Sequence, residues 1–226
     1  MVLCFGLLAA KTATGQSLPA ALPSQWGWGA RGALGYSTGP YRNSNARGED
    51  TFSYPSAAVG LVLTRYVAKP RASIGLEALI EYNLVKVTYQ RATPEPVYHP
   101  QTVFQGRLFV PLYLRTGTPA SVLHGLLGAG PVLALFRSAP DAAYSPRAAE
   151  LALLLGAEVR LAPWHRYETT FGLRLRASLT PSYEYSYPVY YTTSQGAHVA
   201  AESRDVGFSP WLGFTLATTF YPAAAQ

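Results

Sequence analysis

The chain has 226 residues, of which 13% are charged and 13% aromatic, and its formal net charge is +6. Charged residues are about half as frequent as in an ordinary soluble domain, so a soluble fold would have trouble covering its surface with polar groups. The Lys and Arg residues form no run, which argues against nucleic acid as a partner.

The first residues, "MVLCFGLLAAKTATGQ", combine an apolar core from Val2 to Ala10 with small residues at positions 13 and 15. This pattern predicts a secretory signal peptide over residues 1–15 and a mature domain over residues 16–226. The usual positive segment is missing, which indicates that the true signal starts further upstream. The alternative interpretation is a buried N-terminal strand or short helix.

The cysteine count and the hydropathy of the chain exclude further structural features. Cys4 is the only cysteine, and it would leave with the signal peptide. We therefore expect neither a disulfide nor a thiolate metal site in the mature chain. After residue 16 no stretch approaches 18 consecutive apolar residues, so we expect no transmembrane helix.

Eight segments alternate between apolar and polar residues, which is the pattern of strands with two different faces. In chain order they lie at residues 26–36, 56–66, 73–84, 104–115, 123–136, 153–161, 167–180 and 206–220. The first, "WGWGARGALGY", sets Trp and Leu on one face against glycines and Arg31 on the other. The fifth is so rich in Gly and Leu that its faces cannot be assigned.

The connections between these segments alternate between long and short. They span residues 37–55, 67–72, 87–102, 116–121, 137–148, 162–166 and 180–205. The long ones are polar and rich in Pro, Gly, Asn and Tyr. We therefore predict an all-β fold, an eight-stranded antiparallel up-and-down transmembrane β-barrel. Short periplasmic turns, long extracellular loops and two periplasmic termini complete that layout.

The stretch "YETTFGLRLRASLT" (167–180) shows which face meets which solvent. Leu173 and Leu175 alternate with Arg174 and Arg176. A soluble sandwich or lipocalin-type barrel needs many Lys and Glu on its outer face, and this chain has only three Lys. In a membrane barrel, each Arg on the lipid face near the midplane would cost about 2–4 kcal/mol. The apolar faces are therefore predicted to meet lipid, and the charged faces to line the lumen.

By the same parity, nine charged residues form a predicted lumen network. They are Arg31, Glu77, Glu81, Arg107, Glu158, Arg160, Glu168, Arg174 and Arg176. The lumen of an eight-stranded barrel is just wide enough for side chains to fill it, and buried charges must be paired. Inward glycines would make room for the long Arg and Glu side chains, namely Gly27, Gly29, Gly75, Gly156 and Gly172. We therefore expect a filled lumen.

Aromatic residues near the strand ends indicate the girdles of a membrane barrel. They are Trp26, Trp28, Tyr36, Tyr82, Tyr167 and Phe220.

Four short motifs carry a family resemblance: "GLEALIEY" (75–82), "FVPLYLR" (109–115), "GAGP" (128–131) and "GAEVRL" (156–161). With them, the chain resembles the PorT-like outer-membrane β-barrel family of Bacteroidetes-type bacteria. This resemblance implies the outer membrane of a Gram-negative bacterium and a barrel architecture, more than an activity. Because one member of the family is tied to a secretion system, it also implies envelope or secretion-system proteins as partners.

Motifs for catalysis and for cofactors are weak. "GWGARG" (27–32) matches a dinucleotide fingerprint, but its glycines alternate along a strand face and no helix follows. The four histidines have no metal-ligand spacing: His99, His124, His165 and His198. We expect no metal and no cofactor. A hydrolase with its active site at the rim of the barrel is an alternative, because the last long loop holds residues of the types that such sites use: His198, Glu202, Ser203 and Asp205.

The last long loop also carries "PSYEYSYPVYY". Its tyrosines form a candidate binding surface, namely Tyr183, Tyr185, Tyr187, Tyr190 and Tyr191. The interpretation that we prefer is an extension of the last two strands above the membrane, carrying an aromatic girdle. The predicted function is a non-enzymatic outer-membrane protein, structural or interaction-mediating. The alternatives are a narrow porin or small-solute channel and a rim-active hydrolase.

Overall fold

The computed structural model describes residues 26–38, 53–67, 72–91, 97–117, 121–137, 144–164, 167–192 and 198–222. Within these ranges the regular elements are strands. They are β1 (Trp26–Thr38), β2 (Ser53–Val67), β3 (Ala72–Arg91), β4 (Val97–Phe109), β5 (Leu112–Thr116), β6 (Leu123–Arg137), β7 (Tyr144–Pro146), β8 (Ala149–Trp164), β9 (Tyr167–Ser178), β10 (Tyr183–Thr192), β11 (His198–Gly207) and β12 (Trp211–Phe220). No helix long and apolar enough to cross a membrane occurs in this part of the chain.

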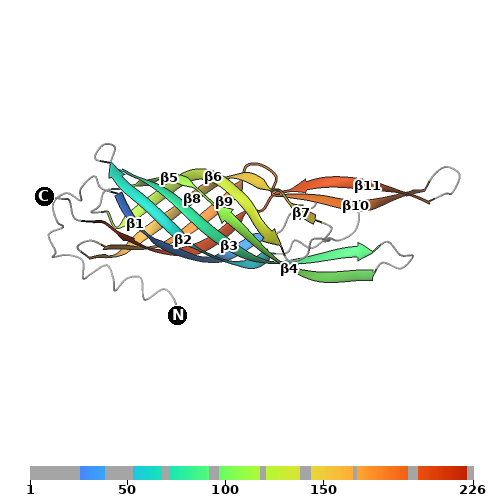
Figure 1. The fold of residues 1–226 in the computed structure, drawn as a ribbon, viewed down its shortest axis with the longest axis horizontal. Helices are drawn as coiled ribbons and strands as arrows, with labels where there is room; N and C mark the ends of the chain where they lie inside the picture. The colour runs from blue at the N-terminus through green and yellow to red at the C-terminus, as the bar shows by residue number, and fades with distance from the viewer. Residues whose placement is uncertain are drawn as a thin grey trace.

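The sheet closes on itself as an eight-walled antiparallel barrel (Figure 1). The walls follow the order β1, β2, β3, β4 with β5, β6, β8, β9 and β12, and β12 pairs back onto β1. β4 and β5 form one wall because both pair with β3 and β6. Hydrogen bonding continues across their break, where Val110 N donates to Pro131 O at 3.0 Å and Glu77 N donates to Pro111 O at 3.1 Å. The predicted fold class is confirmed.

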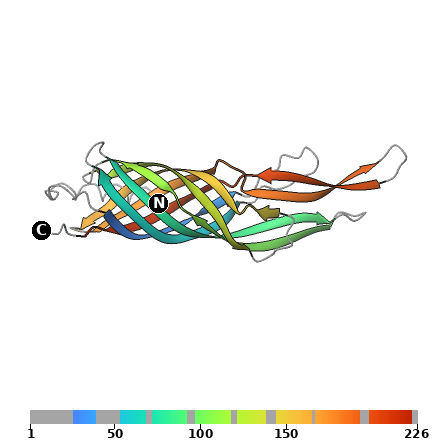
Figure 2. The ribbon, with the colours of Figure 1, turned by 45° about the horizontal axis from the view of Figure 1, so that its top comes forward.

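The two ends of the barrel differ. One end, here the terminal end, holds the start of β1 and the end of β12 (Figure 1). The other, the extension end, continues into two hairpins (Figure 2). In the first hairpin, residues 85–91 of β3 pair with residues 97–103 of β4. The second is a separate sheet in which β10 pairs with β11 and with β7.

This extension corrects three predicted connections. Most of residues 87–102 is paired strand, residues 180–205 contain β10 and nearly all of β11, and residues 137–148 contain β7. Outside a barrel wall, a strand has no face fixed by lipid, so its hydropathy alternates weakly. The preferred interpretation of the last loop, as strands extending beyond the barrel, matches β10 and β11.

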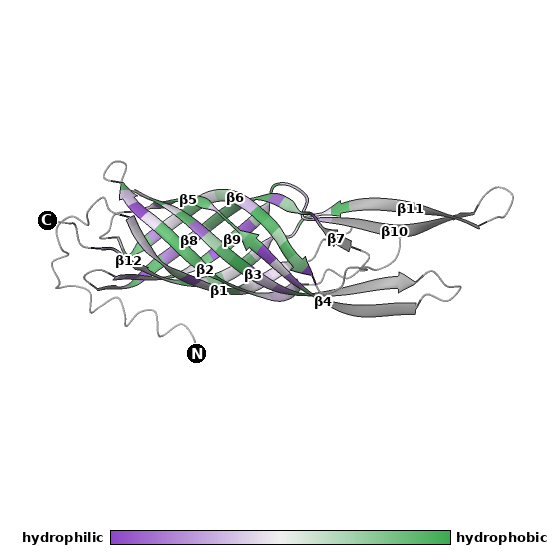
Figure 3. Cartoon of the chain, in the orientation of Figure 1, coloured by the Kyte–Doolittle hydropathy of each residue, from purple (hydrophilic) through white to green (hydrophobic). Residues whose placement is uncertain are grey.

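Hydrophobic and hydrophilic residues alternate along the barrel strands (Figure 3), and the exposed side chains of every wall include large apolar ones. Each wall exposes large apolar side chains, for example Leu34, Leu61, Leu76, Leu112, Leu127, Leu155, Leu173 and Phe214. Leu34 and Leu61 each keep 69% of their surface exposed. Soluble monomers rarely expose continuous apolar surface of this extent.

Aromatic clusters flank this apolar band. At the terminal end, the Phe220 ring lies 5.7 Å from Trp28 and 5.1 Å from Tyr167, centroid to centroid. At the extension end, the Phe104 ring lies 5.9 Å from Tyr82 and 5.6 Å from Phe136. Rings of aromatic residues at both borders are typical of barrels that cross membranes.

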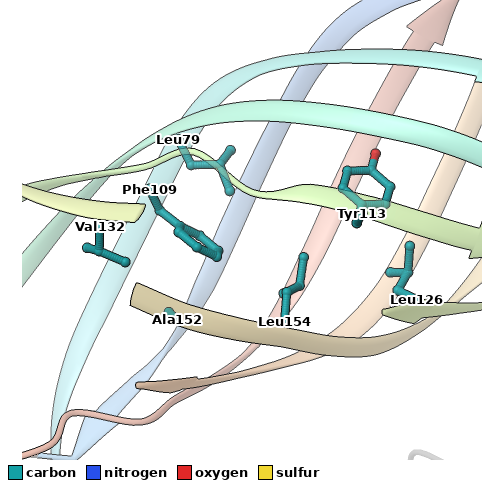
Figure 4. Close-up of a cluster of buried hydrophobic side chains, with 7 residues drawn as sticks. All are labelled: Leu79, Phe109, Tyr113, Leu126, Val132, Ala152 and Leu154. Atoms are coloured by element: carbon teal, nitrogen blue, oxygen red, sulfur yellow. The ribbon is translucent and has the colours of Figure 1, made fainter. Parts of the chain in front are cut away.

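Apolar side chains fill part of the lumen. Figure 4 shows one cluster pointing inward from four walls, formed by Leu79, Phe109, Tyr113, Leu126, Val132, Ala152 and Leu154. A second cluster comes from β1, β2 and β12 and consists of Ala33, Ala58 and Trp211. A cavity of about 10 Å³ lies between residues of the two clusters, room for about one water molecule.

Candidate functional site: the charged lumen

At the terminal end of the lumen, the carboxylate of Glu168 on β9 is the centre of a hydrogen-bonded group. Arg160 donates to it from Nη2 at 2.8 Å, and Arg115 forms a second ion pair with it. The hydroxyls of Tyr66 and Tyr221 each donate to it at 3.1 Å. These partners come from β2, β5, β8 and the residue after β12, so one carboxylate on β9 connects to four other walls.

A second layer crosses the lumen nearer its middle. Arg174 on β9 donates to both oxygens of Glu77 on β3, and its Nη2 also lies 2.7 Å from Glu158 Oε1 on β8. Arg31 on β1 contacts the same two carboxylates, with its Nε 2.9 Å from Glu77 Oε1. Two cations therefore share two anions, which balances the buried charge in this layer.

Two further ion pairs lie toward the extension end. Arg176 pairs with Glu81, and its guanidinium lies over the Phe109 ring at 5.4 Å. Arg107 Nη2 lies 2.9 Å from Glu150 Oε1. Arginine over an aromatic face gains cation–π attraction, which strengthens where water is excluded.

All nine charged residues of the predicted lumen network lie inside the barrel, and each belongs to an ion pair in these layers. Two members were missed. Arg115 has the inward parity of Arg107, and this signal was present in the sequence. Glu150 lies before the predicted strand at 153–161. That strand was predicted to start too late, because Ala148 and Ala149 show no clear alternation of apolar and polar residues.

Two of the inward glycines make room for charged side chains, as predicted. A Cβ added at Gly156 would lie 3.0 Å from Arg174 Cγ, and one at Gly172 would lie 2.6 Å from Glu158 Cγ. These glycines let the long side chains of the neighbouring strand lie flat against the wall.

Three other inward glycines have different neighbours, which corrects the prediction for them. A Cβ at Gly75 would lie 2.1 Å from Tyr113 Cζ, and one at Gly27 would lie 2.4 Å from Tyr221 Cε1. Gly29 lies against the backbone of β12. The first two make room for aromatic rings because tyrosines, as well as charges, fill this lumen.

The extension end of the lumen is covered by hydroxyl-bearing residues. The hydroxyl of Tyr54 on β2 lies 2.9 Å from that of Tyr183 at the start of β10 and 3.3 Å from Ser209 Oγ. The guanidinium of Arg107 lies 5.5 Å from the centre of the Tyr183 ring. Ser182 Oγ accepts from Ser209 N at 3.1 Å.

This arrangement corrects one member of the candidate tyrosine surface. Tyr183 is fully buried, because the base of the β10–β11 hairpin folds over the end of the barrel. The other four tyrosines lie on β10, and their side chains are outside the described residues: Tyr185, Tyr187, Tyr190 and Tyr191.

The other candidate sites are less well described. Within the described part of the chain, no group of three or more His, Cys, Asp or Glu residues could hold a metal ion. His124 Nδ1 lies 2.7 Å from Thr116 O near the terminal end. The candidate hydrolase residues lie on β11 with side chains that are not described: His198, Glu202, Ser203 and Asp205. The predicted signal peptide, residues 1–15, also lies outside the described ranges.

The structure is similar to several solved outer-membrane proteins, at low identity. Outer membrane protein AlkL in DMPC lipid bilayers is 12% identical, with 94% of this chain and 99% of that chain covered and a TM-score of 0.42. Outer Membrane Protein W of E. coli is 13% identical, with 89% and 100% covered and a TM-score of 0.33. An outer membrane channel from Pseudomonas putida F1 is 10% identical, with 91% and 100% covered and a TM-score of 0.31.

Similarities with TM-scores this low do not support an assignment of fold or function. The barrel architecture follows from the strand pairing itself. No family model matches the chain, and no curated protein matches it. The resemblance to the PorT-like family therefore stays a prediction.

Proposed function

We propose that the chain is a non-enzymatic outer-membrane β-barrel protein with a structural or interaction-mediating role. One observation carries the proposal: the closed barrel is apolar outside and ion-paired inside. Leu173 keeps 46% of its surface exposed, whereas the neighbouring Arg174 keeps 2%. In water this distribution would be unfavourable on both faces, because apolar surface would be hydrated and charge desolvated. In a bilayer the outer face is favourable.

The filled lumen supports a structural role over a channel. Arg31 and Arg174 reach across from β1 and β9 to carboxylates on β3 and β8. Apolar side chains such as Phe109 and Leu154 occupy the space between this layer and the extension end. A narrow porin, the alternative, would need a continuous polar path through both regions.

The ends of the barrel support an orientation and a place for partners. Short turns face the periplasm in barrels of this kind, which would put the terminal end, with both termini, in the periplasm. The two hairpins at the extension end would then project outward from the cell. Segments that project from a rigid scaffold are where binding commonly occurs, so envelope or secretion-system proteins are the partner class we propose.

Two fractionation measurements test the membrane assignment. The detergent-extracted mature chain should migrate differently on a gel with and without heating, because a closed barrel stays compact in detergent. It should also stay in the outer-membrane fraction after carbonate washing. Recovery as a soluble monomer without detergent would refute the proposal and favour a lipocalin-type fold.

A further inference from the structure

Buried polar atoms without partners in the described part of the protein lie at several levels of the lumen, and at the extension end they include two whole side-chain amides. Asn83 on β3 and Gln105 on β4 are direct cross-strand neighbours, and both are fully buried. Neither amide has a hydrogen-bond partner for its oxygen or its nitrogen among the described residues. The same holds for Ser37 Oγ and for Arg107 Nε and Nη1. Buried polar groups in folded proteins are nearly always hydrogen-bonded, and water commonly supplies the bond where the protein does not.

This polar region ends at an apolar waist. Ala33, Ala58 and Trp211 come from one side, and Leu79, Phe109 and Leu154 come from the other. They surround the Arg176–Glu81 pair and leave a cavity of about 10 Å³, enough for about one water molecule. Beyond the waist, the carboxylates of Glu77 and Glu168 are satisfied by arginines and tyrosines.

The cover over the polar region is held by hydroxyl groups. The Tyr54 hydroxyl lies 2.9 Å from that of Tyr183 and 3.3 Å from Ser209 Oγ, and the backbone N–H of Ser209 donates to Ser182 Oγ at 3.1 Å. Water offers the same donors and acceptors, so exchanging such a bond for one to water changes the free energy little. An ion-paired or apolar cover would resist this exchange. We therefore expect water to enter at these bonds more easily than past the ion pairs of Glu168 at the terminal end.

We propose that the extension end of the lumen is a hydrated vestibule that takes up water. It opens under the base of the β10–β11 hairpin and ends blind at the apolar waist. This inference rests on the proposed membrane barrel and adds a solvent-accessible site to it. The barrel is then a half-channel that opens at the extension end and is closed at the waist.

Cysteine accessibility tests the vestibule. Single variants S37C, N83C and Q105C, each in a C4S background, are purified as folded barrels in detergent and treated with 2-aminoethyl methanethiosulfonate, a small water-soluble thiol reagent. The control is T170C, which lies on the inner face of β9 between the two layers at the terminal end. Ser37, Asn83 and Gln105 have 0% exposure and Thr170 has 3%, so burial alone predicts equal protection.

The expected result is complete modification of the three vestibule cysteines, read as a mass increase, under conditions that leave T170C unmodified. Protection of all four would overturn the vestibule. Modification of T170C together with the others would overturn its blind end. S37C exchanges one small hydroxyl for a thiol, so it remains informative if N83C or Q105C fails to fold. Heat-dependent gel mobility of each variant reports the barrel independently, so failure of the vestibule and failure of the membrane assignment are distinguishable.

Discussion

Glu77 and Arg174 form a two-pronged ion pair across the lumen, with Nη1 2.7 Å from Oε2 and Nη2 3.0 Å from Oε1. Glu77 is on β3 and Arg174 is on β9, and these strands are not neighbours in the sheet. The pair therefore joins opposite walls. Its geometry is the bidentate one that gives arginine–carboxylate pairs both strength and direction.

The lumen pairs differ in how many partners each arginine serves, which predicts different outcomes for their removal. R176L leaves Glu81 buried and uncompensated and should lower the free energy of unfolding by about 3–5 kcal/mol. The double variant R176L/E81L should recover most of this loss, because replacing both partners of a buried pair by apolar residues is often neutral. Urea unfolding in detergent micelles, followed by Trp fluorescence, measures both.

Arg174 is the matched contrast. It contacts both Glu77 and Glu158, so removing it leaves two carboxylates with fewer partners. R174L/E77L should therefore recover less than R176L/E81L does. Equal recovery in the two cycles would contradict the shared-layer arrangement.

A charge placed on the outer face should cost most near the middle of the apolar band. L173R puts Arg at a position that keeps 46% exposure in that band, and it should destabilise the barrel by about 2–4 kcal/mol. The control is L179R, which follows the end of β9 at the extension end and keeps 53% exposure. There the cost should be about 0–1 kcal/mol. The two variants are compared in lipid vesicles, and equal costs would contradict the lipid-facing assignment.

Two glycines give opposite expectations for the same substitution. At Gly75 an added Cβ would lie 2.1 Å from the Tyr113 ring, whereas at Gly32 on the outer face nothing lies within 4 Å. G75A should destabilise by about 1–3 kcal/mol through overpacking. G32A should stay within about 0.5 kcal/mol of the original chain. The temperature at which the heat-dependent gel shift occurs ranks the variants, and a neutral G75A would mean that Tyr113 can move aside.

The filled lumen predicts little or no steady ion conductance. In planar bilayers the purified barrel should show a flat current, because apolar side chains such as Phe109 and Leu154 and the Glu77–Arg174 layer both interrupt the water path. An empty bilayer and a known porin serve as the two controls. Large, stable, ion-selective steps would favour the narrow-porin alternative.

The barrel walls could be predicted because two solvents act on each strand. On β9, Leu173 faces lipid and Arg174 faces a crowded lumen. A shift of the strand by one residue would put the arginine in lipid, so only one assignment of faces is favourable. The same constraint made the inward parity of Glu77 and Arg31 predictable. Which arginine meets which carboxylate was not predictable, since that depends on the stagger of strands around the closed barrel.

The extension end could not be predicted in the same way. Residues 85–91 and 97–103 form paired strand beyond the apolar band, where hydropathy places little constraint on a strand. The burial of Tyr183 depends on how the start of β10 contacts Tyr54 and Arg107 at the end of the barrel, a tertiary contact with no local signal. The sequence pattern of a run of tyrosines in a predicted loop is the same whether the first of them, here Tyr183, is buried or exposed.

The barrel closes where the first wall meets the last, with residues 28–37 of β1 paired to β12. Before this seam forms, Arg31 cannot reach Glu158 on the far side. An open sheet in a bilayer would also turn its charged face and two unpaired edges toward hydrocarbon, where unsatisfied backbone groups are costly. We therefore expect no stable intermediate in which the sheet is only partly inserted. The same ion pairs that hold the finished barrel make its assembly all-or-none, so entry into the membrane and closure of the ring have to coincide.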